Sequence, residues 1–411
     1  MPAKGKIGVG MVGYGFMGRA HSLAWREVVA AYDVALVPEM LAICGRDSEA
    51  VTSAAERDGW RSWATDWREI VEREDVGLVD VCTPGSSHPE IAIAALDAGK
   101  HVLCEKPLAN TVAEAEAMAL AAERAHERFG TFAMVGFNYR RVPALALARD
   151  LIAAGLLGRV WQVRTQYLQD WLSDPEAPLS WRTQKEESGS GALGDIGSHV
   201  VDLAQHLTGD TIAEVSALTK TFVTERPLVA VSSALTGQAR GFERGPVTVD
   251  DAVLFLGRFS SGAIATFEAT RMATGHKNSL RIEVGGERGY IAFDLERLNE
   301  LEIYESSGPE AGPRRVLATE PEHPYLEAWW PPGHILGWDH TFIHEVRDLL
   351  QGIVGKRQPR PSFADGLGIQ RVLAAVERSA VTGRWTEVAP ALHASPTPDG
   401  KTPVQSATER K

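Results

Sequence analysis

The chain has 411 residues, of which 44% are hydrophobic and 23% charged, so it is long enough for two domains of an ordinary water-soluble protein. A formal net charge of -12, with no local basic cluster, argues against nucleic acid or an anionic membrane as the main partner. No uncharged apolar run reaches the roughly 18 residues of a membrane helix, and the N-terminus lacks a signal peptide's apolar stretch. Because Cys44, Cys82 and Cys104 show no ligand spacing, we expect buried reduced thiols and a cytoplasmic protein.

The chain begins with a short apolar run that is typical of a buried parallel strand. This run ends in a GxGxxG motif from Gly13 to Gly18, in which Phe16 and Met17 are also expected cofactor contacts, and a helix continues from Arg19. Gly13 allows the tight turn, Gly15 lets the backbone approach a pyrophosphate, and Gly18 lets the helix pack on the strand. The first turn of the helix offers N–H donors to a phosphate. Because strand–helix units continue after it, the motif predicts a dinucleotide cofactor.

The second expected strand, residues 40–44, leaves the choice of dinucleotide open. An acidic residue at the end of this strand usually binds the ribose hydroxyls and favours NAD, whereas an arginine can hold the 2′-phosphate of NADP. This chain has Gly45 at the acidic position, followed by Arg46 and Asp47. We therefore expect NAD or NADP as the cofactor, with NAD slightly favoured, and Arg46 and Asp47 as contacts.

Strands and helices alternate up to residue 135, which predicts a doubly wound parallel sheet, the Rossmann arrangement. Helices are expected at 47–58, near 66–73, at 89–98 and at 111–128, with strands at 76–82, 101–104 and 131–135.

Two further segments end strands of this sheet, where ligands of such folds gather. One contains Thr83, Pro84 and His88, and the other contains Glu105 and Lys106. With the glycine motif they are expected to surround one crevice and bind the cofactor. The proline after Lys106 keeps this lysine out of helical geometry, and beside a nicotinamide its ammonium can stabilise charge on a substrate oxygen. The alternative is a solvated surface lysine.

From residue 137 the pattern changes to short strands separated by turns, which predicts a second α/β domain with a large, mostly antiparallel open sheet. We expect a dinucleotide-binding domain over 5–136, a substrate-binding and oligomerisation domain over 137–386, and a disordered tail over 387–411. An open sheet face suggests a homodimer or homotetramer. Strands are expected near 158–167, 213–224, 251–257, 262–270, 279–284, 289–294 and 299–305, and helices at 144–154, from 193, at 340–351 and at 363–381.

Asp195 and His199 lie four residues apart, so on a helix they share a face and can act on one bound molecule. Small residues precede them, and Ile196, Val200 and Leu203 form an adjoining apolar face that anchors the helix. An ordinary core histidine is the alternative for this pair. The aromatic segment 321–342 has two interpretations as well, a wall for a polyhydroxylated ring or a plug at the edge of the core.

Taken together, these motifs resemble the Gfo/Idh/MocA family of sugar and inositol oxidoreductases, over nearly all of the chain up to about residue 385. The resemblance implies a Rossmann domain, a C-terminal α/β domain whose open sheet often mediates dimers or tetramers, and Lys106, Asp195 and His199 at the nicotinamide. It rests on the stretch Val12 to His21, on Thr83-Pro84 with His88, on Glu105-Lys106-Pro107 and on Gly194 to His199.

Within the family, Trp181-Arg182 and Gly333 to His340 look most like bacterial enzymes that act on anhydrosugars, such as levoglucosan, or on glycosides. A small-molecule sugar or polyol is therefore the expected partner, and no metal is expected because the histidines lack ligand spacing. The expected substrate contacts are Tyr139, Arg140, Trp181, Arg182, Asp195, His199 and His340.

These residues predict NAD(P)-dependent oxidation of a secondary hydroxyl on a cyclic sugar, anhydrosugar, glycoside or inositol. His199 would take the hydroxyl proton as general base, Lys106 would stabilise the oxygen, and Asp195 would orient the substrate or set the charge of the other two. Two alternatives stay open. A tightly bound NAD could cycle within one turnover and give epimerisation or glycoside cleavage, or the protein could be a non-catalytic sugar- or nucleotide-sensing regulator.

Overall fold

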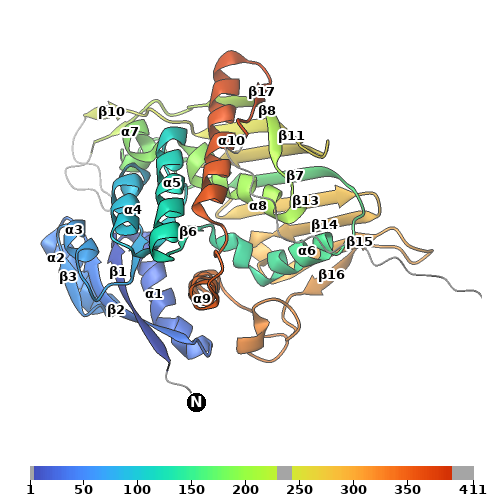
Figure 1. Ribbon diagram of the computed structural model, residues 1–411. Coiled ribbons are helices and arrows are strands. Elements are labelled where there is room, and N and C mark those ends of the chain that lie inside the picture. Colours follow the sequence, from blue (N-terminus) through green and yellow to red (C-terminus); the bar gives the residue numbers. More distant parts are fainter. Residues whose placement is uncertain (1–3, 229–242, 391–411) are drawn as a thin grey trace, which may run out of the picture.

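The computed structural model describes residues 4–228 and 243–390, and two large sheets organise them (Figure 1). The first sheet has six strands in the order β3-β2-β1-β4-β5-β6, and every neighbouring pair is parallel. Its strands are β1 (Gly5–Val12), β2 (Leu36–Cys44), β3 (Ser62–Ala64), β4 (Leu78–Val81), β5 (His101–Glu105) and β6 (Ala133–Gly136). Its helices are α1 (Phe16–Ala31), α2 (Ser48–Asp58), α3 (Trp67–Val71), α4 (His88–Asp97) and α5 (Val112–Phe129). The doubly wound parallel sheet is confirmed.

Local sequence signals explain where these helices begin and end. The Asp47 side chain caps α2 by accepting two backbone N–H bonds, and Thr111 with Glu114 forms a capping box at α5. Both helices end at a glycine in the left-handed conformation, Gly59 for α2 and Gly130 for α5. The carboxyl ends of the strands therefore meet the helix N-termini on one edge of the sheet, where the expected cofactor residues lie.

The second sheet has nine strands in the order β16-β15-β14-β13-β7-β12-β11-β8-β17, and only β12 and β7 run parallel. The prediction of a mostly antiparallel sheet is confirmed. Its strands are β7 (Val160–Leu168), β8 (Ile212–Lys220), β11 (Ala252–Phe259), β12 (Ile264–Thr270), β13 (Ser279–Gly286), β14 (Gly289–Asp294), β15 (Glu300–Glu305), β16 (Arg314–Leu317) and β17 (Thr386–Glu387). A separate pair consists of β9 (Glu225–Pro227) and β10 (Arg244–Pro246).

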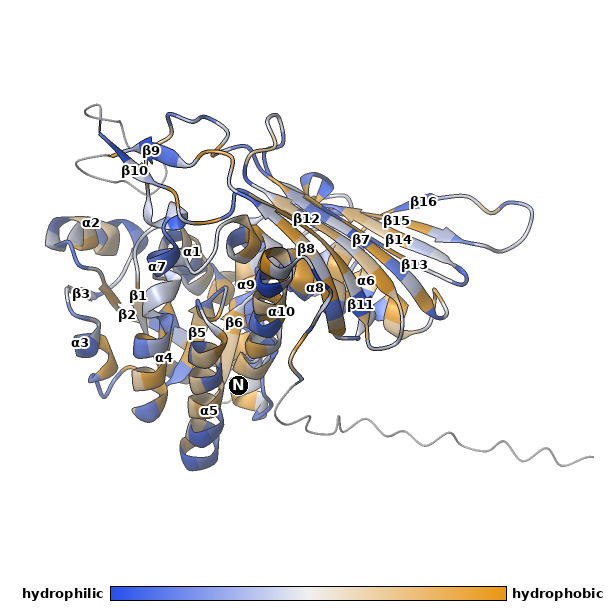
Figure 2. Ribbon diagram, turned by 90° about the horizontal axis from the view of Figure 1, so that it is seen from above, coloured by the Kyte–Doolittle hydropathy of each residue, from blue (hydrophilic) through white to orange (hydrophobic). Residues whose placement is uncertain are grey.

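Among the described residues, helices cover only one face of this second sheet (Figure 2). Along β11 the burial alternates, so Phe255 packs inward against Phe267 while Leu254 and Leu256 point outward. The helices of this half are α6 (Pro143–Ala153), α7 (Lys185–Ser188), α8 (Ser198–Thr208), α9 (Asp339–Gly355) and α10 (Phe363–Thr382). The open face that the sequence predicts is present in the described chain.

The last two helices return to the first sheet. α9 packs on α1, and α10 packs on both α5 and β8 (Figure 1). The segment between them joins the edge of the first sheet, because the N–H of Val135 donates to the carbonyl of Pro361 and Met134 bridges Ser362. The division into domains at residue 136 stays a prediction, since the chain crosses between sheets there but later crosses back.

The expected tail begins too early at residue 387. Glu387 belongs to β17, and the N–H of Val388 donates to the carbonyl of Ala213, so this segment completes the edge of the second sheet. The rest of the expected tail, residues 391–411, lies outside the described residues. The expected strand 213–224 is also too long, because β8 ends at Lys220. Within the described ranges, no helix has the length and apolarity needed to cross a membrane.

Candidate active site

Lys106 is the first residue after β5, and its side chain reaches across to the segment before α8. Its Nζ donates to the Asp195 carbonyl at 2.7 Å and lies 3.4 Å from Asp195 Oδ1. The Lys106 side chain is 14% exposed and that of Asp195 28% exposed, so both groups retain a surface that a ligand can reach. The sequence interpretation of Lys106 as a crevice residue fits this placement better than a solvated surface lysine.

The expected helix from 193 is confirmed, but its first turn, Leu193–Gly197, is a π-helical turn that carries Asp195 and leads into α8. Asp250 anchors the start of this segment by accepting the N–H groups of Gly191 at 2.7 Å and Leu193 at 2.8 Å. A Cβ at Gly191 would lie 1.7 Å from the Asp250 carbonyl, so only glycine fits there. π turns inside helices occur frequently at functional sites.

The Asp195 carboxylate is held ionised by cations around it. Burial raises its pKa, but Lys106, Arg271 and Arg182 outweigh burial and lower the pKa to about 2. Arg271 is buried, and its Nη1 lies 3.5 Å from Asp195 Oδ2. Sequence reasoning missed Arg271, because it follows a strand of the second sheet and carries no motif.

His199 lies on the first turn of α8 and is surrounded by aromatic rings. Its ring centroid lies 4.6 Å from that of Tyr139, 5.8 Å from Phe137 and 6.0 Å from Tyr167. Burial and the Lys106 ammonium lower the pKa of His199 well below its ordinary value, against the opposite effect of Asp195. The imidazole is therefore neutral near pH 7 and can accept a proton.

A chain of hydrogen-bonded polar side chains begins at Tyr139 and continues along the end of β7. The Tyr139 and Tyr167 hydroxyls are 2.8 Å apart, and the Tyr167 hydroxyl donates to Asn278 Oδ1 at 2.7 Å. Gln169 donates to the same oxygen at 2.7 Å and accepts from the Trp171 indole at 3.0 Å. Sequence reasoning found only Tyr139. The spacing of 167, 169 and 171 places these side chains on one face where a strand ends, which is the signal that could have revealed them.

The glycine motif forms a cradle at the N-terminus of α1 that fits a pyrophosphate. Gly13 has φ +109°, and a Cβ there would lie 2.6 Å from the Cys82 carbonyl, while a Cβ at Gly18 would lie 2.0 Å from the Gly13 carbonyl. Gly15 has open space around it and caps α1 without a side chain. Met17 is half-buried and Phe16 is 51% exposed beside this open space.

The residues that follow β2 already make contacts within the protein. Asp47 Oδ1 accepts the N–H groups of Glu49 and Ala50, both at 3.0 Å, and so caps α2. A Cβ at Gly45 would overlap the Tyr14 ring at 1.9 Å, so the aromatic ring takes the place of a side chain there. Arg46 is exposed next to it.

Two of the residues expected to bind the cofactor lie beneath the crevice. His88 is buried, and its ring nitrogens face the carbonyls of Thr83 on one side and of Pro107 and Leu108 on the other. It therefore joins the two loops that end β4 and β5. Glu105 is buried as well. The half-buried Thr83 and Pro84 present the surface of this segment.

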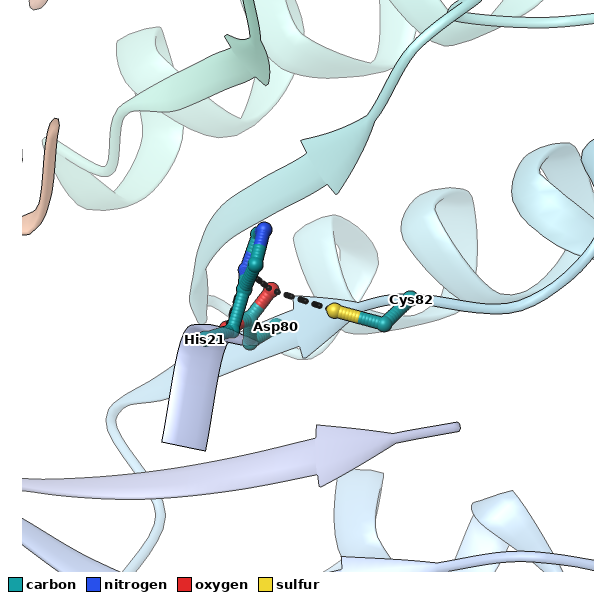
Figure 3. Close-up of side chains that lie close together, drawn as sticks. All are labelled: His21, Asp80 and Cys82. Atoms are coloured by element: carbon teal, nitrogen blue, oxygen red, sulfur yellow. Dashed lines mark hydrogen bonds and ion pairs between the residues drawn. The ribbon is translucent and has the colours of Figure 1, made fainter. Parts of the chain in front are cut away.

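Below the glycine motif, His21 pairs with Asp80, whose carboxylate also accepts from Cys82 (Figure 3). The Asp80 carboxylate accepts from the Trp25 indole as well. The donor atoms of His21, Asp80 and Cys82 lie within 4.8 Å of one another, as a metal site would require. Their hydrogen bonds already pair them with each other, and His21 Nε2 is 3.0 Å from Glu105 Oε1. Burial raises the pKa of the Cys82 thiol, which disfavours the thiolate that a metal needs. The cluster is a hydrogen-bonded network.

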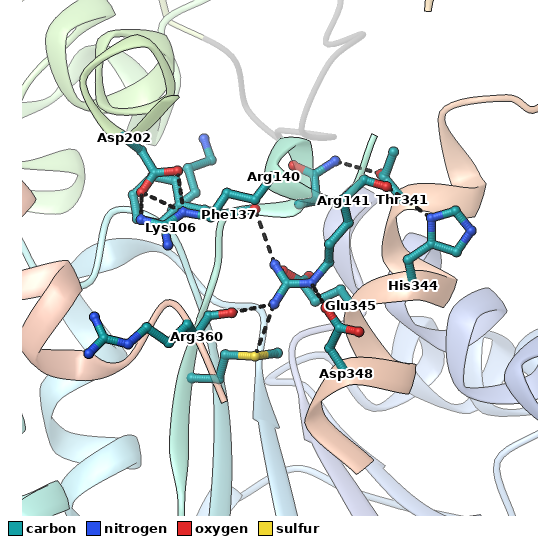
Figure 4. Close-up of polar contacts among 12 residues, drawn as sticks. Lys106, Phe137, Arg140, Arg141, Asp202, Thr341, His344, Glu345, Asp348 and Arg360 are labelled. Atoms are coloured by element: carbon teal, nitrogen blue, oxygen red, sulfur yellow. Dashed lines mark hydrogen bonds and ion pairs between the residues drawn. The ribbon is translucent and has the colours of Figure 1, made fainter. Parts of the chain in front are cut away.

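Arg140 and Arg141 extend in opposite directions from the short helix η2 (Asn138–Arg141) (Figure 4). Arg140 binds both oxygens of Asp202, with a shortest distance of 2.5 Å, so the guanidinium expected to contact substrate is committed to α8. Arg141 is buried and pairs with Glu345 and Asp348 of α9, each at 3.2 Å. These pairs fix η2, and with it Tyr139, between the two halves.

The other expected substrate contacts come from two loops. The Arg182 guanidinium lies 4.3 Å from the Trp181 ring, and the Arg182 carbonyl accepts from Arg271, which brings this loop to Asp195. His340 makes an edge contact with Trp329 at 4.6 Å. Of the two interpretations of the aromatic loop 321–342, the plug at the core edge fits Trp329, and the wall for a sugar ring stays a prediction. Trp329 is a core plug packed on Tyr32 and His344, whereas Trp338 stacks on Phe16 of the cofactor cradle.

With this geometry established, the chain can be compared with known proteins. Residues 7–133 match the oxidoreductase family with an NAD-binding Rossmann fold, and residues 145–292 match the GFO/IDH/MocA C-terminal domain. A levoglucosan dehydrogenase from Pseudarthrobacter phenanthrenivorans is 42% identical over 387 residues, which cover 93% of this chain and 98% of that protein.

Solved structures show the same likeness. An oxidoreductase domain protein from Kribbella flavida is 59% identical and superposes with a TM-score of 0.89, over 94% of this chain and all of that chain. A levoglucosan dehydrogenase in complex with NADH and levoglucosan is 41% identical and superposes with a TM-score of 0.87, over 94% of this chain and 100% of that chain.

Proposed function

Since this chain belongs to the Gfo/Idh/MocA family of oxidoreductases, we propose that it oxidises a secondary hydroxyl of a cyclic sugar, anhydrosugar, glycoside or inositol by hydride transfer to a nicotinamide. One observation carries the proposal. Lys106, which follows β5, meets the segment that carries both Asp195 and His199 at the carboxyl edge of the parallel sheet, the edge that also carries the cradle at Gly15.

In this proposal each of the three residues has a separate task. His199, neutral and buried, accepts the proton of the substrate hydroxyl, and the nearby Asp195 carboxylate stabilises the resulting imidazolium. Lys106 donates a hydrogen bond to the same substrate oxygen and stabilises its developing negative charge. The nicotinamide, when bound, accepts the hydride from the carbon. The Tyr139–Tyr167–Asn278 chain offers hydroxyl and amide groups to the remaining ring hydroxyls.

We propose NAD(H) as the preferred dinucleotide. A relative 41% identical to this chain has been solved in complex with NADH. On this chain the cradle residues would hold the pyrophosphate, and Asp47, which already caps α2, lies at the end of β2 where the ribose hydroxyls are bound in such folds. The exposed Arg46 is the feature that favours NADP, so the cofactor needs a direct comparison.

Within the sugars, we propose an anhydrosugar of the levoglucosan type as the substrate class. The support is the levoglucosan dehydrogenase relative, which aligns with 93% of this chain. The aromatic faces of Trp171 and Trp181 and the polar chain from Tyr139 to Gln169 suit a ring with apolar faces and polar edges. We also propose that the enzyme acts in the cytoplasm.

We further propose that the open face of the second sheet is covered by a second copy of the chain. A hollow of about 1060 Å³ lies on this face, remote from Lys106, and apolar side chains line it together with both signs of charge. Leu218, Leu254 and Leu256 are exposed there. Charges on neighbouring strands already pair, for example Arg281 with Asp294, which reduces repulsion between two copies and suits a self-complementary contact.

The test is nicotinamide reduction by the purified protein, with NAD and NADP in separate assays. The panel contains levoglucosan, inositols, aldoses and glycosides. We expect absorbance at 340 nm to rise with levoglucosan and NAD. No reduction across the panel, with NADH binding shown by fluorescence, would contradict the proposal. Product formation without net reduction would instead identify an internally cycling enzyme, and binding of sugar without any product would identify a regulator.

A further inference from the structure

Glu105 contacts the backbone of the lysine that follows it and also a histidine of the cofactor helix. Its Oε2 accepts the N–H of Lys106 at 3.0 Å, and its Oε1 lies 3.0 Å from His21 Nε2. The other ring nitrogen of His21 lies 3.0 and 3.1 Å from the two oxygens of Asp80 on β4. One continuous set of contacts therefore joins α1, β4 and β5 and ends at the backbone of Lys106.

With Asp80 and Glu105 both ionised, this arrangement requires a protonated histidine. Carboxylate oxygens only accept, so an imidazole that bonds a carboxylate through each ring nitrogen must carry both N–H groups. His21 is 1% exposed, and Phe342 of α9 covers it at 5.4 Å between ring centroids. Trp25 also donates to Asp80, at 2.7 Å, so the partner carboxylate is fixed in turn.

Every charged or titratable group that faces His21 favours the protonated state of its imidazole. Asp80 and Cys82 face it from β4, Glu105 and Cys104 from β5, and Glu345 from α9. Burial lowers the pKa of His21, but Asp80 and Cys82 outweigh burial and raise this pKa well above its ordinary value.

We propose that His21 is a positioning residue for Lys106: as an imidazolium held between Asp80 and Glu105, it keeps the Glu105 carboxylate on the Lys106 N–H and so fixes where the ammonium lies. The inference rests on the role of Lys106 in the proposed function. It connects the two parts of the site, because α1 carries the cofactor cradle at its N-terminus and His21 in its second turn. A displacement of about 1 Å at a reacting group can cost roughly 100-fold in rate.

The experiment compares His21→Gln with His344→Gln. His344 is a matched control, since it is buried and bonded on both ring nitrogens, to Trp329 at 2.8 Å and to the Arg141 carbonyl at 2.9 Å, without touching Glu105. With levoglucosan and NAD as probes, His21→Gln is expected to lower kcat roughly 10- to 100-fold. The dissociation constant for NADH, measured by fluorescence, is expected to change less than about 3-fold. His344→Gln is expected to lower stability and leave kcat nearly unchanged.

A pH profile distinguishes positioning from a general loss of structure. Without the imidazolium, Glu105 is a buried carboxylate that has lost its cation, so the variant favours the protonated carboxyl and the bond to the Lys106 N–H weakens. The kcat deficit of His21→Gln is therefore expected to shrink as the pH rises from 6 to 9. An equal loss in both histidine variants, or a deficit that does not vary with pH, would overturn the proposal.

Two further measurements keep the test decisive. If His21→Gln fails to fold, Glu105→Ala takes its place, because it removes the oxygen that accepts the Lys106 N–H. It is expected to lower kcat in the same range, and an unchanged kcat would overturn the proposal. Histidine-selective ¹⁵N NMR of the full chain is expected to show His21 still doubly protonated at a pH where an ordinary histidine is neutral. A neutral His21 would overturn the proposal even in a protein without dehydrogenase activity, so the two failures are distinguishable.

Discussion

Phe16 and Trp338 stack with ring centroids 5.5 Å apart and an interplanar angle of 13°, although they come from opposite ends of the chain. Phe16 follows the open Gly15 of the cofactor cradle, and Trp338 precedes α9 in the aromatic loop. Trp338 also meets Phe342 edge-on at 4.6 Å, which anchors it to the core of the first half. The stack therefore fixes one wall of the cradle to the loop of the second half.

Replacing Trp338 should accordingly disturb cofactor binding and substrate binding together. An aromatic pair contributes about 1 kcal/mol beyond its buried area, so Trp338→Ala is expected to weaken NADH binding several-fold and to raise KM for the sugar. Fluorescence titration and steady-state kinetics measure the two effects. Trp330→Ala is the control, because Trp330 lies in the same loop and is 63% exposed. Equal behaviour of the two variants would show that the stack has no such role.

Lys106→Ala removes the ammonium that, in the proposed function, stabilises the substrate oxygen. Loss of one donor to a developing oxyanion costs roughly 100- to 1,000-fold in kcat, and we expect a loss of that size here. NADH binding should stay within about 3-fold, because the cradle at α1 does not depend on the Lys106 side chain. Lys6→Ala, at an exposed lysine that pairs with Glu39, is the control. If turnover and nucleotide affinity fell equally, the assigned role of Lys106 would be wrong.

Most of the fold could be predicted because its signals are local. The glycine motif, the caps at Asp47 and Thr111 and the alternating burial of β11 each depend on residues close together in the sequence. The short strand β17 was missed because it exists only through pairing with the distant β8, and β16 was missed because it is a short edge strand that pairs only with β15. The same cause explains the wrong start of the tail at residue 387.

The residues of the candidate site differ in the same way, because some lie in local motifs and others are placed only by long-range folding. Lys106, Asp195 and His199 lie in recognisable motifs, and the structure brings them together. Arg271 and Asn278 lie in loops without a motif, and only the folded second sheet places them near Asp195 and Tyr167. Arg140 was expected to contact the substrate from its place in the sequence, but its guanidinium binds Asp202. Its contact with substrate stays a prediction.

Glu345 should make the stability of the protein depend on pH. Burial raises the pKa of this carboxyl from 4.5 to about 7, against the opposite effect of Arg141. The folded protein then holds a proton that the unfolded chain releases, so this contribution to stability is lost as the pH rises from about 4.5 to 7. Glu345→Gln cannot ionise. Its stability relative to the wild type should therefore increase over this window, by roughly 3 kcal/mol at most.

Denaturant unfolding of both proteins at several pH values between 5 and 8 measures this difference. The comparison is made between variant and wild type because other groups that titrate in this range contribute equally to both. Glu377→Gln, at an exposed carboxyl that pairs with Lys185, is the control, and its difference from the wild type should stay level. A level difference for Glu345→Gln as well would show that Glu345 is ionised throughout the range.

Charges placed on the open face of the second sheet should separate the proposed copies. Leu254 and Leu256 are 48% and 49% exposed at the centre of this face, and their neighbours on β11 point into the core. The double variant Leu254→Asp with Leu256→Asp adds two charges that burial between subunits would leave unpaired, at a cost of several kcal/mol. Light scattering coupled to gel filtration should show an oligomer for the wild type and a monomer for the variant. Val381→Asp, at an exposed apolar residue of α10, should leave the oligomer intact. A wild-type monomer, or an oligomer that survives both aspartates, would assign this face another role.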